Sequence, residues 1–153
     1  MAQLDHLYTA AALPEDPRPG TRPLADTALG ALGIELLECG ADRVVARMPV
    51  DGSTAMRSRM LVLAETAAST AAGIAAGPGL RAFGTELNAS IVATPAAGPV
   101  LASALPLMLG TDRHVWRIVA CDATGARVLE ARCTLSIVAT PPAPRVVPSA
   151  PAH

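Results

Sequence analysis

The stretch RMLVLAETAASTAAGIAA, residues 59–76, decides the fold of this chain. Its apolar side chains lie nearly all the way round a helix, and a helix without a polar face is usually buried. A carboxylic acid, Glu65, nevertheless stands near the middle, with Ser69 one turn later on the same face. Because burying an unpaired carboxylate is costly, Glu65 is a candidate catalytic group. The alternative is an acid that reaches solvent or pairs with a distant arginine.

The segments around this helix read as strands separated by short turns. Ser58 is the expected N-cap, and residues 77–79 (Gly-Pro-Gly) end the helix. A short helix over 23–32 and two strands, over 34–39 and 43–49, precede it. Four strands follow, over residues 83–92, 100–109, 114–122 and 128–138.

This element order predicts an α+β domain in which a curved antiparallel sheet wraps around one long buried helix. The domain is expected to span residues 23–139. Residues 1–22 are rich in proline and charge and are expected to form a flexible arm. Residues 140–153 are proline-rich and are expected to be a disordered tail.

Composition excludes several classes of protein. The net charge of −1 gives no electrostatic case for binding nucleic acid. The chain has no uninterrupted apolar run long enough for a membrane span, and its first residues lack the pattern of a signal peptide, so a cytoplasmic location is expected. Lysine is absent, which excludes a Schiff-base lysine.

Cysteines and histidines give no metal site. The three cysteines fall in strand-like stretches without a Cys-x-x-Cys pair, and small buried side chains are the expected role. Of the three histidines only His114 lies outside the terminal segments. No metal and no cofactor are therefore expected.

Five sequence words carry a resemblance to a known family. They are LGIELLE (32–38), ARMPVD (46–51), LAET (63–66), GTELNAS (84–90) and LMLGTDRHVWRIVACDATGARV (107–128). In order and spacing they resemble the hotdog-fold thioesterases of the phenylacetate-degradation type. That branch contains the 1,4-dihydroxy-2-naphthoyl-CoA, aryl-carrier-protein and hydroxybenzoyl-CoA thioesterases. The resemblance implies the hotdog fold and hydrolysis of an acyl thioester.

The resemblance also implies roles for residues of the long helix. In the family an acid on the core helix is catalytic, as general base or nucleophile, and its position matches Glu65. A hydroxylated residue one turn later positions the water, and that position matches Ser69. A backbone N–H at the helix start stabilises the oxyanion, which implies a catalytic role for Arg57 and Ser58.

The chain departs from the family just before this helix. Family members usually carry His-Gly-Gly there, with a glutamine a few residues earlier. Here Met56 stands in the place of the histidine, Arg57 and Ser58 replace the glycines, and the glutamine has no counterpart. The nearby arginines either replace these lost donors, bind a phosphate, or are solvated charges at a helix start. Candidate substrate-binding residues are Met56, Arg59, Asn88, Ser90 and Arg113.

Three functions remain open at this point. The first is hydrolysis of an acyl-CoA or acyl-carrier-protein thioester. The second is a non-catalytic acyl-binding or pathway-assisting hotdog protein without the His/Gln carbonyl clamp. The last is a hotdog hydratase, which needs a histidine paired with an acid and has only His114 to offer. In the family, sheets of two subunits join edge to edge, so a homodimer or a dimer of dimers (a homotetramer) is expected.

We predict that the chain ends are dispensable for folding. Both ends are proline-rich and lack a periodic apolar pattern, so they bury little surface. Removing residues 1–20 and 141–153 should therefore leave the melting temperature within a few degrees of the full chain. Differential scanning calorimetry of both proteins measures this, and a larger fall shows that an end is docked on the domain.

Overall fold

In a computed structural model of the chain, residues 27–95 and 98–140 are described. The expected arm, the expected tail from residue 141 onward and the first part of the predicted helix over 23–32 lie outside these residues. The elements are α1 (Ala28–Leu32), β1 (Glu35–Cys39), β2 (Val44–Pro49), α2 (Met56–Ala76), β3 (Leu80–Ile91), β4 (Pro99–Leu109), β5 (Arg113–Cys121) and β6 (Arg127–Ala139).

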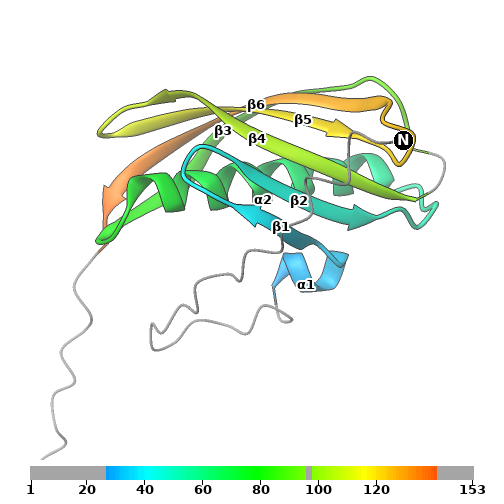
Figure 1. The fold of residues 1–153 in the computed structure, drawn as a ribbon, viewed down its shortest axis with the longest axis horizontal. Helices are drawn as coiled ribbons and strands as arrows, with labels where there is room; N and C mark the ends of the chain where they lie inside the picture. Colours follow the sequence, from blue (N-terminus) through cyan, green and yellow to red (C-terminus); the bar gives the residue numbers. More distant parts are fainter. Residues whose placement is uncertain (1–26, 96–97, 141–153) are drawn as a thin grey trace, which may run out of the picture.

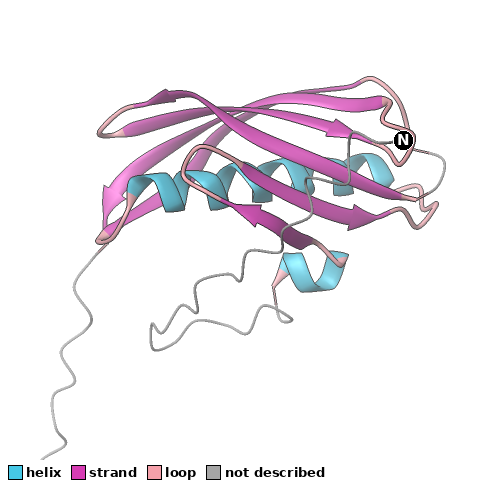
Figure 2. Ribbon diagram, viewed as in Figure 1, coloured by secondary structure: helices cyan, strands magenta, loops and turns pink. Residues whose placement is uncertain are grey.

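The six strands form one antiparallel sheet in the order β1-β2-β4-β5-β6-β3. The strand β3 follows the long helix in the chain but pairs with β6, the last strand, and so occupies an edge. Figures 1 and 2 show the sheet curving over one side of α2. The predicted arrangement of a curved antiparallel sheet around one long helix is confirmed.

Side chains alternate between the two faces of the sheet. On β5, His114, Trp116 and Ile118 are buried while Arg113 and Arg117 are exposed. The buried set faces α2 and defines the inner face of the sheet, and the other set defines the outer face.

The helix α2 packs on this inner face and contacts all six strands. Its buried side is made mostly of alanine, so the helix backbone lies close to the sheet. The fully buried alanines are Ala64, Ala67, Ala68, Ala71 and Ala72.

The other side of α2 departs from the expectation of a helix buried all the way round. Leu61, Val62 and Glu65 are only partly buried, and Arg57 and Ser58 are exposed. One six-stranded sheet curves over only one side of the helix, so the opposite side stays open within a single chain. In the described part of the chain, neither helix is long and apolar enough to cross a membrane.

The start of α2 also differs from the sequence-based prediction. The helix begins at Met56, and the N-cap is Ala55, whose side chain caps nothing. Ser58 therefore lies inside the first turn and is not the cap. The backbone N–H of Met56 donates to the Ser53 carbonyl at 3.1 Å, a turn that continues directly into the helix.

Arg59 ties the first turn of α2 to two other segments. Its Nη2 donates to the carbonyl of Leu32, the last residue of α1, at 3.2 Å, and its Nη1 pairs with the Asp51 carboxylate. Hydrogen bonds from Ser53 hold the pKa of the Asp51 carboxyl below its ordinary value, and the charge of Arg59 adds to this. Gly33 follows Leu32 and ends α1 in the left-handed conformation (φ +63°), which glycine adopts at little cost.

We expect Arg59→Met to destabilise the domain by about 1–2 kcal/mol, because it removes a partly buried charged donor from the Leu32 carbonyl and from Asp51. Arg57→Met is the matched control, since Arg57 lies two residues away and is exposed. Urea unfolding of both variants gives the comparison. The contribution of the ionised Asp51 to stability is lost as pH falls through its lowered pKa. The difference between the two variants in free energy of unfolding should therefore become smaller in acid. Equal stabilities at neutral pH would contradict this role.

Candidate active site

Glu65 and Ser69, the two residues of the long helix expected to act in catalysis, lie side by side in the structure. Both are partly buried and lie one turn apart on the open side of α2. The Ser69 hydroxyl donates a hydrogen bond to Oε1 of Glu65. Within the described residues the other carboxylate oxygen, Oε2, has no hydrogen-bond partner. A carboxylate with one oxygen held and the other free is suited to accept a proton or to attack an electrophile.

The edge strand β3 passes beside this carboxylate. A Cβ placed on Gly84 would lie 3.4 Å from Oε1 of Glu65, so the bare backbone of β3 faces the acid. Gly84 is exposed and Glu65 only partly buried, so the carboxylate opens toward this edge of the sheet.

Cys133 of β6 lies on the inner face of the sheet, is buried, and is near enough to Glu65 to be affected by its charge. Burial raises the pKa of the Cys133 thiol to about 11, and the negative charges of Glu65 and Glu86 add to this shift. At neutral pH about one thiol in 10⁴ is therefore ionised. Cys133 is an inert neighbour of the carboxylate and not a competing nucleophile.

Within the described part of the chain, the first turn of α2 leaves two backbone N–H groups free. The N–H groups of Arg57 and Ser58 have no partner in the described residues, while those of Met56 and Arg59 bond to the preceding turn. Free N–H groups at a helix N-terminus can stabilise a negative charge. From Arg57 to Glu65 the helix rises by eight residues, about 12 Å, so donors and acid of one chain do not meet on one carbonyl group.

The side chains of Met56 and Arg59 do not face the Glu65 carboxylate as open binding groups. Met56 is 2% exposed and packs in the core. The guanidinium of Arg59 is engaged by Asp51 and by the Leu32 carbonyl.

Three further candidates lie on the outer face of the sheet, away from Glu65. Asn88 and Ser90 alternate with inward-facing side chains of β3 and pair with Arg132 and Glu130 of β6. Arg113 is exposed and precedes the inward-facing His114 on β5. The structure therefore brings Glu65 and Ser69 together but leaves these three residues on the other side of the sheet.

His114 is buried and does not meet the acid. It lies in a row with Leu135 and Gly84 across three neighbouring strands, so it is about 10 Å from the backbone that faces Glu65. Desolvation lowers the pKa of His114, and its Nδ1 has no hydrogen-bond partner in the described structure. The histidine–acid pair that a hydratase needs is not formed with Glu65.

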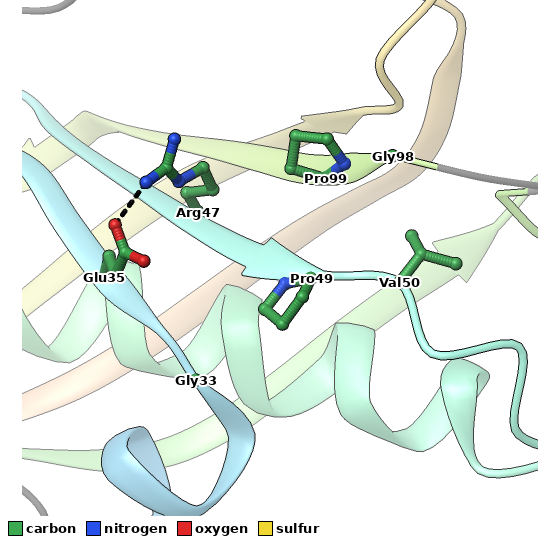
Figure 3. Close-up of a pocket in the computed structure, with 7 residues that line it drawn as sticks. All are labelled: Gly33, Glu35, Arg47, Pro49, Val50, Gly98 and Pro99. Atoms are coloured by element: carbon green, nitrogen blue, oxygen red, sulfur yellow. Dashed lines mark hydrogen bonds and ion pairs between the residues drawn. The ribbon is translucent and has the colours of Figure 1, made fainter.

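A separate open groove of about 480 Å³ lies at the ends of β2 and β4 nearest the start of α2 (Figure 3). The Glu35–Arg47 ion pair lines one part of the groove, and prolines, glycines and Val50 line the remainder. Its two charged groups satisfy each other, and none of the predicted catalytic residues lines it. The lining residues are Gly33, Glu35, Arg47, Pro49, Val50, Gly98 and Pro99.

Sequence reasoning missed two neighbours of the acid, Gly84 and Cys133. Gly84 belongs to the GTELNAS word, but its place opposite Glu65 depends on the pairing of β3 with β6. Across residues 27–95 and 98–140, no group of three or more His, Cys, Asp and Glu side chains is placed to hold a metal ion.

Comparison with known proteins adds an independent line of evidence. No model of a protein family matches the chain. A Bacillus subtilis (strain 168) protein named "Putative esterase ComA2" is 37% identical over 119 residues, covering 73% of this chain and 94% of that protein. The 1,4-dihydroxy-2-naphthoyl-CoA hydrolase of Escherichia coli (strain K12) is 32% identical, covering 72% and 85%. The crystal structure of thioesterase HI1161 from Haemophilus influenzae superposes with a TM-score of 0.72 at 30% identity, covering 76% and 85%.

Proposed function

The chain belongs to the hotdog-fold thioesterase superfamily, and from that premise we propose that it hydrolyses an acyl thioester with Glu65 as the catalytic carboxylate. The observation that carries the proposal is the hydrogen-bonded Glu65–Ser69 pair, which lies partly buried in the middle of α2. Acids that are partly withdrawn from water and held by a hydrogen bond cluster at functional sites.

The chemistry follows from the free carboxylate oxygen. As general base, Glu65 takes a proton from water while the water oxygen bonds to the thioester carbonyl carbon. The C–S bond then breaks, and the sulfur leaves as a thiol after taking up a proton. As nucleophile, the Glu65 carboxylate instead attacks the thioester carbonyl carbon, and the C–S bond breaks to release a thiolate that takes a proton from water. Water then hydrolyses the resulting anhydride, which releases the acyl group as a carboxylic acid and restores Glu65. Both routes need the ionised acid, and Ser69 supports it by donating a hydrogen bond to Oε1.

The oxyanion donors are proposed to come from a second copy of the chain. The free N–H groups of Arg57 and Ser58 suit this role, since backbone donors do not depend on side-chain identity. Because they lie about 12 Å along the helix from Glu65 in their own chain, they serve the acid of a neighbouring copy. The site is thus shared between two subunits.

The edge strand β3 is the proposed place of contact between the two copies. It is twelve residues long, and its backbone pairs with β6 on one side only. Long edge strands tend to pair with another chain, and Glu65 lies beside this edge, so pairing here would bring a second copy close to the acid. We further propose that two such dimers associate, because β4 carries exposed apolar side chains that a second dimer would cover. These are Leu105, Leu107, Met108 and Leu109.

The substrate is proposed to be an acyl-CoA or an acyl-carrier-protein thioester. The relative in Escherichia coli named 1,4-dihydroxy-2-naphthoyl-CoA hydrolase supports a CoA thioester. The reaction requires water and a carboxylate, and no cofactor enters it. The free cysteines Cys39, Cys121 and Cys133 agree with the reducing cytoplasm as the place of reaction.

One observation favours a second function, that of a non-catalytic acyl-binding protein. The buried Met56 offers no side-chain donor where family members usually carry a histidine. Losing a carbonyl donor typically lowers turnover by about 10²–10³. Release of free thiol from a panel of acyl-CoA and acyl-carrier-protein thioesters separates a hydrolase from a binder.

We expect Glu65→Gln to lower kcat on the best thioester of that panel by at least about 10², because it keeps the shape and removes the base or nucleophile. Ser69→Ala should cost less, since it removes a hydrogen bond to the acid and no reacting group. Glu86→Gln is the matched control, because Glu86 is an exposed acid on β3. If Glu65→Gln retains turnover within about threefold of wild type, Glu65 is a structural acid and the proposal fails.

We expect a dimer or larger assembly at micromolar concentration, because the site lacks its oxyanion donors within one chain. Sedimentation equilibrium of the full chain measures the mass directly. An active monomer would contradict the shared site, since about 12 Å separates the two halves of the machinery in one chain.

A further inference from the structure

The backbone conformation at position 84 does not require glycine. Its φ angle is outside the left-handed region that favours glycine, unlike six other glycines of the described chain. A glycine within a strand weakens the strand, because it offers no side chain to pack and loses more conformational freedom on folding. The fold by itself would therefore prefer another residue at this position.

Space around Gly84 is limited by one atom. A Cβ built on Gly84 meets a single heavy atom within 4 Å, Oε1 of Glu65, at 3.4 Å. That separation is ordinary van der Waals contact, so the surrounding strands tolerate a methyl group here. What a methyl group would occupy is the space directly beside the carboxylate.

A β-bulge places Gly84 against the acid. The pairing of β3 with β6 shifts between Gly84 and Glu86, which leaves Thr85 as the extra residue. The Thr85 hydroxyl donates to the Thr134 carbonyl at 3.1 Å and fastens the bulge to β6. Bulges of this kind re-aim the backbone near functional sites.

We propose that Gly84 is a positioning residue of the thioesterase site, whose missing side chain keeps open the space in which water or the thioester carbonyl reaches Glu65. The inference rests on the function proposed above and goes beyond it by assigning a residue of β3 to the reaction. Reacting atoms must come within about 3–3.5 Å of each other. Oε1 is the oxygen that Ser69 holds, and the free Oε2 belongs to the same carboxylate. A methyl group in contact with Oε1 therefore narrows the approach to this carboxylate from the β3 side.

The proposal is tested with Gly84→Ala, and with Gly84→Ser as a second small substitution. Both should lower kcat by at least about tenfold, with a smaller change in KM, because contacts to the remote parts of the substrate remain. The melting temperature should stay equal or rise, since a strand glycine has been replaced. Gly73→Ala is the matched control, because Gly73 is exposed on α2 and a Cβ there meets nothing within 4 Å.

A double-mutant cycle separates an effect on Glu65 from a general disturbance. In a Glu65→Gln background, adding Gly84→Ala should leave the residual rate within about twofold, because the group it obstructs is already gone. Sedimentation of each variant checks that the assembly is unchanged.

The outcomes are distinguishable. Normal kcat in a folded Gly84→Ala protein, with Glu65→Gln inactive, overturns this inference and leaves the proposed function standing. A lower melting temperature or a broken assembly in both Gly84 variants also overturns it, because Gly84 is then a structural glycine. If the wild type hydrolyses no thioester of the panel, the proposed function and this inference fall together.

Discussion

The close packing of the alanine face of α2 against the inner face of the sheet is the constraint on which the rest of this structure depends. Alanine at five buried positions allows the helix backbone to lie near the strands, and this places the middle of α2 level with the edge strand β3. Larger side chains on that face would separate the layers and move Glu65 away from β3. The layer distance is therefore both a property of the core and a condition for the site.

The partial burial of Glu65 lies between two unfavourable extremes, full burial and full exposure to solvent. A carboxylate deep in an apolar layer would be strongly disfavoured in its ionised form, whereas a fully solvated one would gain little from the protein. Glu65 lies between these limits, partly buried at the sheet edge and held by Ser69. The bare backbone of Gly84 leaves one side of the carboxylate accessible, at the expense of some strand stability.

In the first turn of α2, side chains hold the helix in place while backbone N–H groups remain free. Met56 is buried in the core and Arg59 is tied to Asp51 and α1, so both hold the helix start in place. The backbone N–H groups of Arg57 and Ser58 remain free, although the side chains expected there in the family are absent. A chain can lose those side chains and keep the donors, because the donors belong to the helix itself.

Local sequence patterns by themselves determined the element order, the antiparallel sheet around one helix, and the pairing of Glu65 with Ser69, because each depends on periodicity or on spacing within one helix turn. Only the tertiary structure decided which neighbours that acid has. Asn88, Ser90 and Arg113 lie on the outer face, and Gly84 and Cys133 lie beside the acid. These placements follow from strand register and from a bulge between β3 and β6, whose paired residues lie 38 to 59 positions apart in the chain. A shift of register by one residue exchanges the two faces of a strand, and local sequence does not specify such long-range pairing.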